Sequence, residues 1–266
     1  MRKIVLFAIA LFMFFVCNAI TQATNDIADV VENIRDKVSI TFDAIDNDMS
    51  RAAREIYPAA REGYDTRNVL SSLYKAHKNI VDCAFVDSEG VIAVVEPEAY
   101  KNFQGQDISR QEHVQRLHQT QKPLMSEAFL SVEGFRAVDI AYPVFKAGAF
   151  AGSLSMLCEP HIFLSGIITP LIKGDNIEVW VMQKDGMILY DRNAEGIGKN
   201  IFTDNDYQNF PQLLNLAKRI SREREGQGNY TFWQDGFAKP VQKNACWATV
   251  DFHGTQWRIV VAAAQP

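Results

Sequence analysis

The chain has 266 residues, of which 47% are hydrophobic, 22% charged and 11% aromatic, and its formal net charge is −5. This composition is typical of a folded globular chain and excludes the disordered, collagen-like and coiled-coil classes. The acidic balance argues against a nucleic-acid partner, because binding to phosphate backbones requires clustered positive charge.

The first segment has the pattern of a secretory signal. Arg2 and Lys3 precede an apolar run over residues 4–16, and the small-residue pattern at residues 21–23 follows it. The run is shorter than the roughly 20 apolar residues that cross a bilayer. We therefore expect residues 1–23 to be a signal peptide, with an uncleaved membrane anchor as the alternative. Either reading predicts a periplasmic or extracellular location for the rest of the chain.

The cysteines fit neither a disulfide framework nor a zinc site. Cys17 lies in the predicted signal, and the mature chain keeps Cys83, Cys158 and Cys246, an odd number at wide spacings. Each of the three lies in an apolar, strand-like context, which predicts buried thiols. A bridge between Cys83 and Cys158 stays open if their strands are neighbours.

A long helix is predicted after the signal, over residues 26–56. Its apolar residues recur at steps of three, four and seven, and Pro58 ends or kinks it; they are Ile27, Val31, Ile34, Val38, Ile45, Met49, Ala52 and Ile56. A second helix follows over residues 66–79, so residues 24–79 are expected to form a helical spine. The apolar stripe of the first helix would also suit a parallel homodimer.

The rest of the chain contains an internal repeat. Residues 81–92 and 177–188 each read as a strand, an acidic-Gly turn and a second strand. In each copy a Gly-x-Asp/Asn-Ile loop, a helix and two closing strands follow in the same order. The sequence therefore predicts two copies of one module, at residues 80–158 and 175–264, joined by a short linking helix over residues 159–174.

The order of these motifs resembles the double Cache family of extracytoplasmic sensor domains. The resemblance rests on residues 85–92, 105–109, 140–144 with 151–152, and 247–260, and it covers nearly the whole mature chain. It implies an α/β (α+β) fold in which a long N-terminal helix is followed by two PAS-like antiparallel-sheet modules in tandem, the distal one at 80–158 and the proximal one at 175–264.

The resemblance also implies a function. Double Cache domains bind small metabolites, usually in the distal module, and signal through a following membrane helix to histidine kinases, chemotaxis receptors or cyclic-dinucleotide enzymes. The apolar C-terminal tail, residues 257–264, is too short to span a bilayer. We therefore expect an exported binding protein that passes its signal to a separate membrane receptor or kinase, or one tethered by its N-terminal segment.

Two groups of residues are candidates for ligand binding in the first copy. Arg110 and His113, three apart on a predicted helix over residues 109–121, would present hydrogen-bond donors to a carboxylate. The alternative is a solvated helix face. Asp139 in an apolar strand could receive a ligand amine, or it could pair with Arg136 or face solvent.

Further candidates lie on the predicted strands. Tyr142 is expected on the opposite face from Asp139, because strand side chains alternate. The others offer an acid, an aromatic wall and small hydroxyls, with plain core packing as the alternative: Glu127, Phe129, Ser153 and Ser155. The tryptophan or tyrosine of the family's amino-acid-binding subset is missing from the lid helix. A carboxylate, an amine or another small metabolite therefore stays open as the ligand.

The second copy is predicted to be structural, with little pocket, because its many aromatic residues more often fill a core. The sequence also lacks the metal spacing of histidines, the nucleophile elbow, the phosphate-binding glycine loop and the dinucleotide fingerprint. We therefore expect a non-enzymatic protein without metal or cofactor. Two alternatives are a ligand-free structural or dimerisation module and an unrecognised hydrolase.

Overall fold

The computed structural model describes residues 2–56, 64–174, 176–233 and 239–265, with side chains from residue 26 and, after the first gap, from residue 66. The chain forms two compact units. The first module comprises residues 37–169 and 250–256, and the second module comprises residues 1–36, 170–249 and 257–266. Each contains an antiparallel sheet with helices, which confirms the predicted α/β fold of two sheet modules after a long helix.

Helix α1 runs without interruption from Arg2 to Glu55. The predicted apolar stripe is confirmed, because every one of its members from Ile27 to Ile56 is buried. These side chains are covered within a single chain, so they are not available to a second copy, and the homodimer stays a prediction without their support. Pro58 lies outside the described residues. No helix in the described part of the chain is long and apolar enough to cross a membrane.

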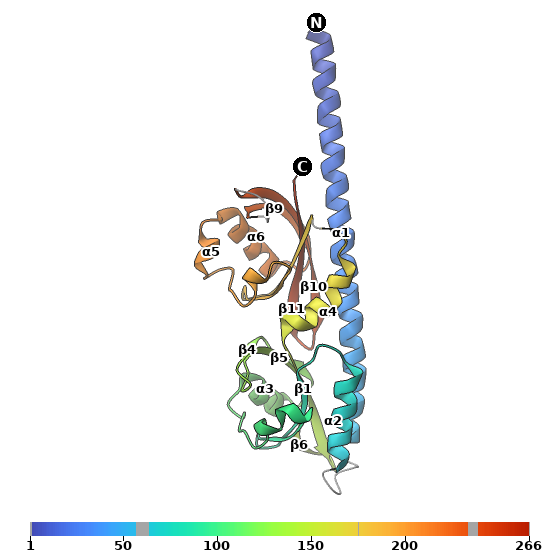
Figure 1. Cartoon of the computed structure of the whole chain (residues 1–266), viewed down its shortest axis with the longest axis vertical. Coiled ribbons are helices and arrows are strands. Elements are labelled where there is room, and N and C mark those ends of the chain that lie inside the picture. The colour runs from blue at the N-terminus through green and yellow to red at the C-terminus, as the bar shows by residue number, and fades with distance from the viewer. Residues whose placement is uncertain (1, 57–63, 175, 234–238, 266) are drawn as a thin grey trace. The chain divides into compact units, whose positions relative to one another are not determined.

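The first module is built on a sheet of order β2-β1-β6-β5-β3, with β4 paired to β5. Helix α3 lies on one side of this sheet, and α2 and the adjoining part of α1 lie on the other (Figure 1). The strands are β1 (Asp82–Asp87), β2 (Ile92–Glu96), β3 (Leu124–Met125), β4 (Phe129–Leu130), β5 (Arg136–Lys146) and β6 (Ala149–Cys158). The helices are α2 (Tyr64–Ala76), η1 (Glu98–Phe103), α3 (Glu112–Thr120) and α4 (Pro160–Ile168).

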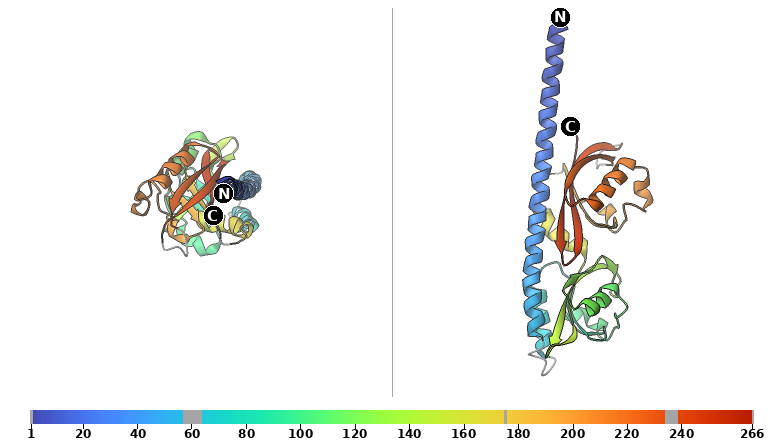
Figure 2. Two further views of the ribbon diagram at one scale, coloured as in Figure 1. Left: turned by 90° about the horizontal axis from the view of Figure 1, so that it is seen from above. Right: turned by 180° about the vertical axis from the view of Figure 1, so that it is seen from behind.

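The second module has a sheet of order β8-β7-β11-β10-β9. Helices α5 and α6 cover one face of this sheet (Figure 2). The strands are β7 (Ile177–Gln183), β8 (Ile188–Asp191), β9 (Gly226–Phe232), β10 (Val241–Phe252) and β11 (Thr255–Ala264). The helices are η2 (Thr169–Leu171), which begins one residue before the module, η3 (Ala194–Gly196), α5 (Asn205–Gln208) and α6 (Pro211–Arg222).

The structure confirms the internal repeat in its details. An isolated bridge joins Val91 to Asp107 in the first module, and Met187 to Asn200 in the second. The hairpin glycines Gly90 and Gly186 have φ of 86° and 93°, a region that favours glycine. The strand order of the two sheets is equivalent element by element, so both modules have the same architecture.

Cys83, Cys158 and Cys246 are buried thiols, as their apolar contexts predict. Strands β1 and β6 are neighbours, but Cys83 pairs with Met156 in their register. The bridge to Cys158 that the sequence left open is therefore not formed.

Candidate functional site

Two aspartates lie on the same face of the first module's sheet, with strand β6 between them. In the register of β1, β6 and β5, Asp82 and Asp139 both pair with Leu157, one on each side of it. Ser155 lies two residues before Leu157, so its side chain points to the same face, because strand side chains alternate. This is the face that α3 covers, and α3 contributes the buried His113.

Asp139 is held by neutral partners. The Ser155 hydroxyl donates to its Oδ1 at 2.5 Å, and Nε2 of His113 lies 3.6 Å from its Oδ2. Its backbone N–H donates to Oγ of Ser126 at 2.9 Å. The side chain is 3% exposed, so solvent exposure is wrong as an explanation of this residue, and these contacts replace the predicted pairing with the exposed Arg136.

These groups line a small cavity of about 30 Å³. It has room for about two water molecules, since one needs roughly 10–15 Å³. Four of the predicted residues meet there: His113, Phe129, Asp139 and Ser155. The half-buried Phe129 ring lies 4.4 Å from the His113 imidazole, centroid to centroid. The wall also includes Asp82, Gln111, Ser131, Val132 and Glu133.

The cavity brings together acidic oxygens that are buried from solvent. Burial raises the pKa of Asp139 to about 7, against the opposing effect of the Ser155 hydrogen bond. Burial, followed by the charges of Glu133 and Asp139, raises the pKa of Asp82 well above its usual value. Among the described residues, Asp82 Oδ2, Glu133 Oε2 and Ser131 Oγ are buried without a hydrogen-bond partner.

The histidine of the site is kept neutral. Burial, followed by the charge of Arg116, lowers the pKa of His113 to about 4. A neutral imidazole beside Asp139 can donate one hydrogen bond but brings no positive charge. His113 therefore does not supply the positive charge that would favour the ionised forms of the acids, whereas a cation bound in the cavity would.

Three predicted residues lie away from the cavity. Arg110 is exposed in the turn before α3, which begins at Glu112. The helical face predicted for Arg110 and His113 is therefore wrong. Glu127 is exposed on the segment between β3 and β4. Ser153 is buried on β6 but does not line the cavity.

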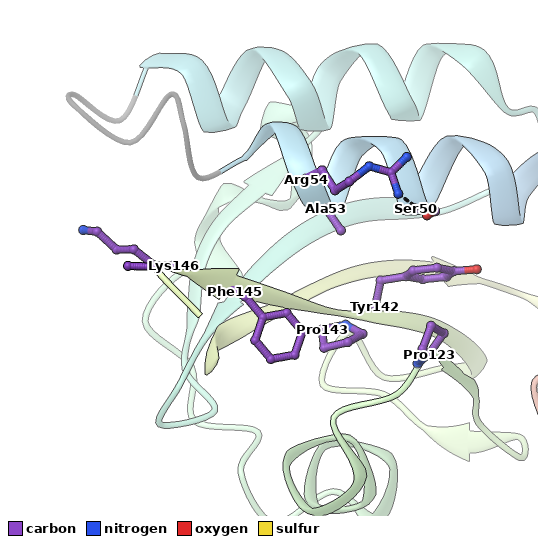
Figure 3. Close-up of a pocket in the computed structure, with 9 residues that line it drawn as sticks. Ser50, Ala53, Arg54, Pro123, Tyr142, Pro143, Phe145 and Lys146 are labelled. Carbon is purple, nitrogen blue, oxygen red and sulfur yellow. Dashed lines mark hydrogen bonds between the residues drawn. The ribbon is translucent and has the colours of Figure 1, made fainter. Parts of the chain in front are cut away.

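Tyr142 lies on the opposite sheet face from Asp139, as the alternation predicts. Its hydroxyl hydrogen-bonds to Asp46 of α1 and lies 2.7 Å from Nε2 of His253. Beside it a separate hollow of about 540 Å³ opens between α1 and β5, with Arg54 on the helix side and Phe145 on the strand side (Figure 3).

Tyr142→Phe tests whether this residue has a structural role. Loss of a hydrogen bond to a carboxylate is expected to lower the free energy of unfolding by about 1–3 kcal/mol. Ligand binding in the acidic cavity is expected to stay unchanged, because Tyr142 does not line it. Chemical denaturation and calorimetric titration of the same preparation measure both effects, and weakened binding with unchanged stability would contradict this role.

Sequence reasoning missed part of what the structure contains. Asp82 and Glu133 were not singled out, although Asp82, like Asp139, is an acid flanked by apolar strand residues. The second module was expected to have little pocket, and this is wrong. A cavity of about 1000 Å³ opens there, walled in part by Tyr207 and by four aromatic residues that were predicted to fill the core: Trp180, Tyr230, Phe232 and Trp233.

Comparisons with known proteins find a matching family model and similar solved structures. Residues 40–160 match the family model of the HK/GC/chemotaxis protein-like sensor domain. An extracellular ligand-binding receptor from Desulfohalobium retbaense is 29% identical with a TM-score of 0.76, and the alignment covers 90% of this chain and 40% of that one. This chain thus spans less than half of that receptor's structure. A search of curated proteins finds no match.

Two other solved structures share the fold at lower identity. The ligand-binding domain of the Pseudomonas aeruginosa amino acid chemoreceptor PctB, in complex with L-Gln, is 13% identical with a TM-score of 0.65, covering 91% of this chain and 90% of that one. The periplasmic sensory domain of the Campylobacter jejuni chemoreceptor Tlp1 is 17% identical with a TM-score of 0.64, covering 92% and 96%. Residues 40–160 are thus similar to a sensor domain, and the chain shares the two-module fold of extracellular ligand-binding sensor domains, in agreement with the resemblance to the double Cache family.

Proposed function

We propose that this sensor domain binds a small metabolite through its ammonium group in the cavity of the first module. The observation that carries the proposal is the pair of buried, unpartnered oxygens, Asp82 Oδ2 and Glu133 Oε2, beside the buried Asp139. An ammonium group brings a positive charge and up to three hydrogen-bond donors. It would satisfy the oxygens that the described residues leave without partners.

Binding requires the cavity to enlarge. The present volume of about 30 Å³ holds water but not an organic molecule. The segment from Phe129 to Glu133 supplies four of the lining residues, and its ties to the sheet are short, since β4 has two residues. Displacement of this segment would open the cavity towards solvent while Asp82 and Asp139 stay fixed on the central strands.

The relatives support an ammonium ligand. Solved sensor domains of this fold are complexes with L-Gln, L-alanine and asparagine, each of which carries an ammonium group. Their identities to this chain are 13–15%, so they support the ligand class by analogy. A ligand-free structural module would leave the buried acids of the first module without a role.

We place this function outside the cytoplasm and without catalysis. The signal-like pattern at residues 1–23 and the extracellular and periplasmic relatives support the location. A bound metabolite would then act on a membrane receptor or kinase, as sensor domains of chemoreceptors and histidine kinases do.

A thermal-shift panel tests the ligand class. Amino acids, their decarboxylated amines and simple carboxylates are each added to the full chain, since a ligand of the native state raises its stability. We expect hits among compounds with a primary ammonium group and none among carboxylates that lack one. Asp139→Asn is expected to weaken the best hit by at least tenfold in calorimetric titration, because it removes one charge from the cavity.

Glu89→Gln is the matched control. It removes one carboxylate charge at an exposed position of the same module, so it is expected to leave the affinity unchanged. If both variants weakened ligand binding equally, the effect of Asp139→Asn would come from the net charge of the protein and not from the cavity. Binding of carboxylates without an ammonium group, lost on Asp139→Asn, would overturn the proposal.

A further inference from the structure

We propose that the second module holds a separate binding site for an organic cation, an amine or methylated ammonium compound, in the cavity of about 1000 Å³. The cavity lies within one module, between the sheet and the segments that carry η3 and α5. It needs no enlargement, because binding cavities for small molecules commonly measure about 300–1000 Å³.

Aromatic residues form much of its wall. Trp180 and Tyr230 come from the sheet strands β7 and β9, Tyr207 comes from α5, and Phe232 and Trp233 lie at the end of β9. The ring of Tyr207 stacks on that of Phe232 with centroids 5.8 Å apart. Faces of aromatic rings attract cations, most strongly where water is excluded.

The charges around the cavity also favour a cation. Asp191 and Glu195 line it, while the basic residues nearby have acidic or carbonyl partners. Nζ of Lys199 lies 2.5 Å from Oδ2 of Asp206, and the Arg192 guanidinium donates to the carbonyls of Gly174 and Ile177 at 3.0 and 2.6 Å. The carboxylates that line the cavity therefore outnumber its basic side chains.

The buried Lys243 behind the wall is neutralised as well. Its Nζ lies 2.6 Å from both carboxylate oxygens of Glu178. Tyr207 on the wall lies near several of these charges: burial raises its pKa, and the charges of Asp191, Asp204 and Asp206 raise it further. A ligand with a positive head and apolar methyl or methylene groups therefore matches both the charge and the rings.

Choline is the probe for this site, and 3,3-dimethylbutan-1-ol is its uncharged isostere. Titration of each into the full chain is followed by tryptophan fluorescence, to which Trp180 and Trp233 on the cavity wall contribute. We expect choline to bind and the alcohol to bind at least tenfold more weakly, because only choline has the charge that rings and carboxylates recognise. Equal binding of choline and the alcohol would overturn the proposal. So would a failure of both choline and ethanolamine to bind.

Asp191→Asn and Asp185→Asn locate the binding site. Each aspartate accepts a hydrogen bond from the backbone N–H two residues later at 2.9 Å, and asparagine can keep that bond. Only Asp191 lines the cavity. We therefore expect Asp191→Asn to weaken choline about tenfold and Asp185→Asn to leave it unchanged.

The first-module variant Asp139→Asn separates this proposal from the proposed function. It is expected to leave choline binding at the second-module cavity intact. Choline binding that is lost in Asp139→Asn and kept in Asp191→Asn would assign the cation to the first module and overturn the second site. Failure of the amine panel at the first cavity, with choline still sensitive to Asp191→Asn, would overturn only the proposed function.

Discussion

Asp139→Asn is expected to gain stability relative to the wild type as the pH rises from about 4 to about 7. Burial raises the pKa of Asp139 from 3.8 to about 7 in the native protein. Such an acid contributes stability at low pH that is lost as the pH rises through its native pKa. Asparagine does not ionise, so the difference in unfolding free energy, variant minus wild type, should grow by roughly 4 kcal/mol across this range, at about 1.4 kcal/mol per pKa unit.

His113→Gln is expected to show the opposite slope. Burial lowers the pKa of His113 from 6.5 to about 4. The stability that the neutral imidazole contributes is present above about 6.5 and is lost as the pH falls towards 4. Glutamine lacks this loss, so the variant should gain on the wild type by roughly 3 kcal/mol as the pH falls. The two opposing contributions partly cancel in the wild type, and only the variants separate them.

Hydrogen exchange of β1, β5 and β6 across this pH range measures the effect in the first module. Tryptophan fluorescence would not report on it, because all four tryptophans lie in the second module. Glu89→Gln, which removes an exposed carboxylate from the same module, is again the control. The neighbouring acids Asp82 and Glu133 remain in both variants, so the difference from the wild type contains the titration of the replaced group and, for Asp139→Asn, the loss of its effect on the pKa of Asp82. A flat profile for Asp139→Asn would mean that this carboxyl ionises as readily in the native protein as in the unfolded chain.

The fold was predictable because short local patterns in the sequence determine its helices and hairpins. The stripe from Ile27 to Ile56 has the period of a helix, and Gly90 and Gly186 mark equivalent hairpins 96 positions apart. The long helix and both sheets follow from such signals. The start of α3 was missed because residues 109–111 have helix-compatible side chains but form the turn that ends in Gln111, the residue before the helix.

The sites were only partly predictable, because they depend on register and packing. Asp139 was recognisable as an acid among apolar neighbours, but only the pairing of β1 and β5 with β6 places Asp82 on the same sheet face, on the other side of β6. The large second cavity was missed for a different reason. Tyr207, Tyr230 and Phe232 have the composition of a core, and a linear sequence does not say whether aromatic rings meet one another or leave space between them.

Glu178→Ala is expected to destabilise the second module far more than Lys243→Met. The Lys243 side chain is fully buried, whereas 31% of the Glu178 side chain is exposed. Removal of Glu178 leaves a buried ammonium whose close polar partner, within the described parts of the chain, is the Trp233 carbonyl at 2.5 Å. Breaking a buried pair in this way costs about 3–5 kcal/mol. Lys243→Met leaves a carboxylate that water can reach and fills the space with a similar chain, so its cost should be less than half of that.

The double variant completes the comparison. Glu178→Ala with Lys243→Met removes both charges, and it is expected to recover most of the stability that Glu178→Ala loses, because no uncompensated ion remains. Denaturation followed by tryptophan fluorescence reports on this module. Equal losses in the two single variants, with no recovery in the double, would contradict the asymmetry in exposure as the cause.

The Glu178–Lys243 pair also affects the charge of the proposed cation site. The two single variants are therefore expected to change the affinity for choline in opposite directions. Glu178→Ala leaves the Lys243 ammonium uncompensated 5.9 Å from the Tyr230 ring and 5.7 Å from the Phe232 ring, both on the cavity wall. Choline should then bind more weakly, since like charges repel across a medium of low dielectric. Lys243→Met instead leaves the Glu178 carboxylate on the wall without its counter-ion, so choline should bind more tightly than to the wild type, although the variant is less stable.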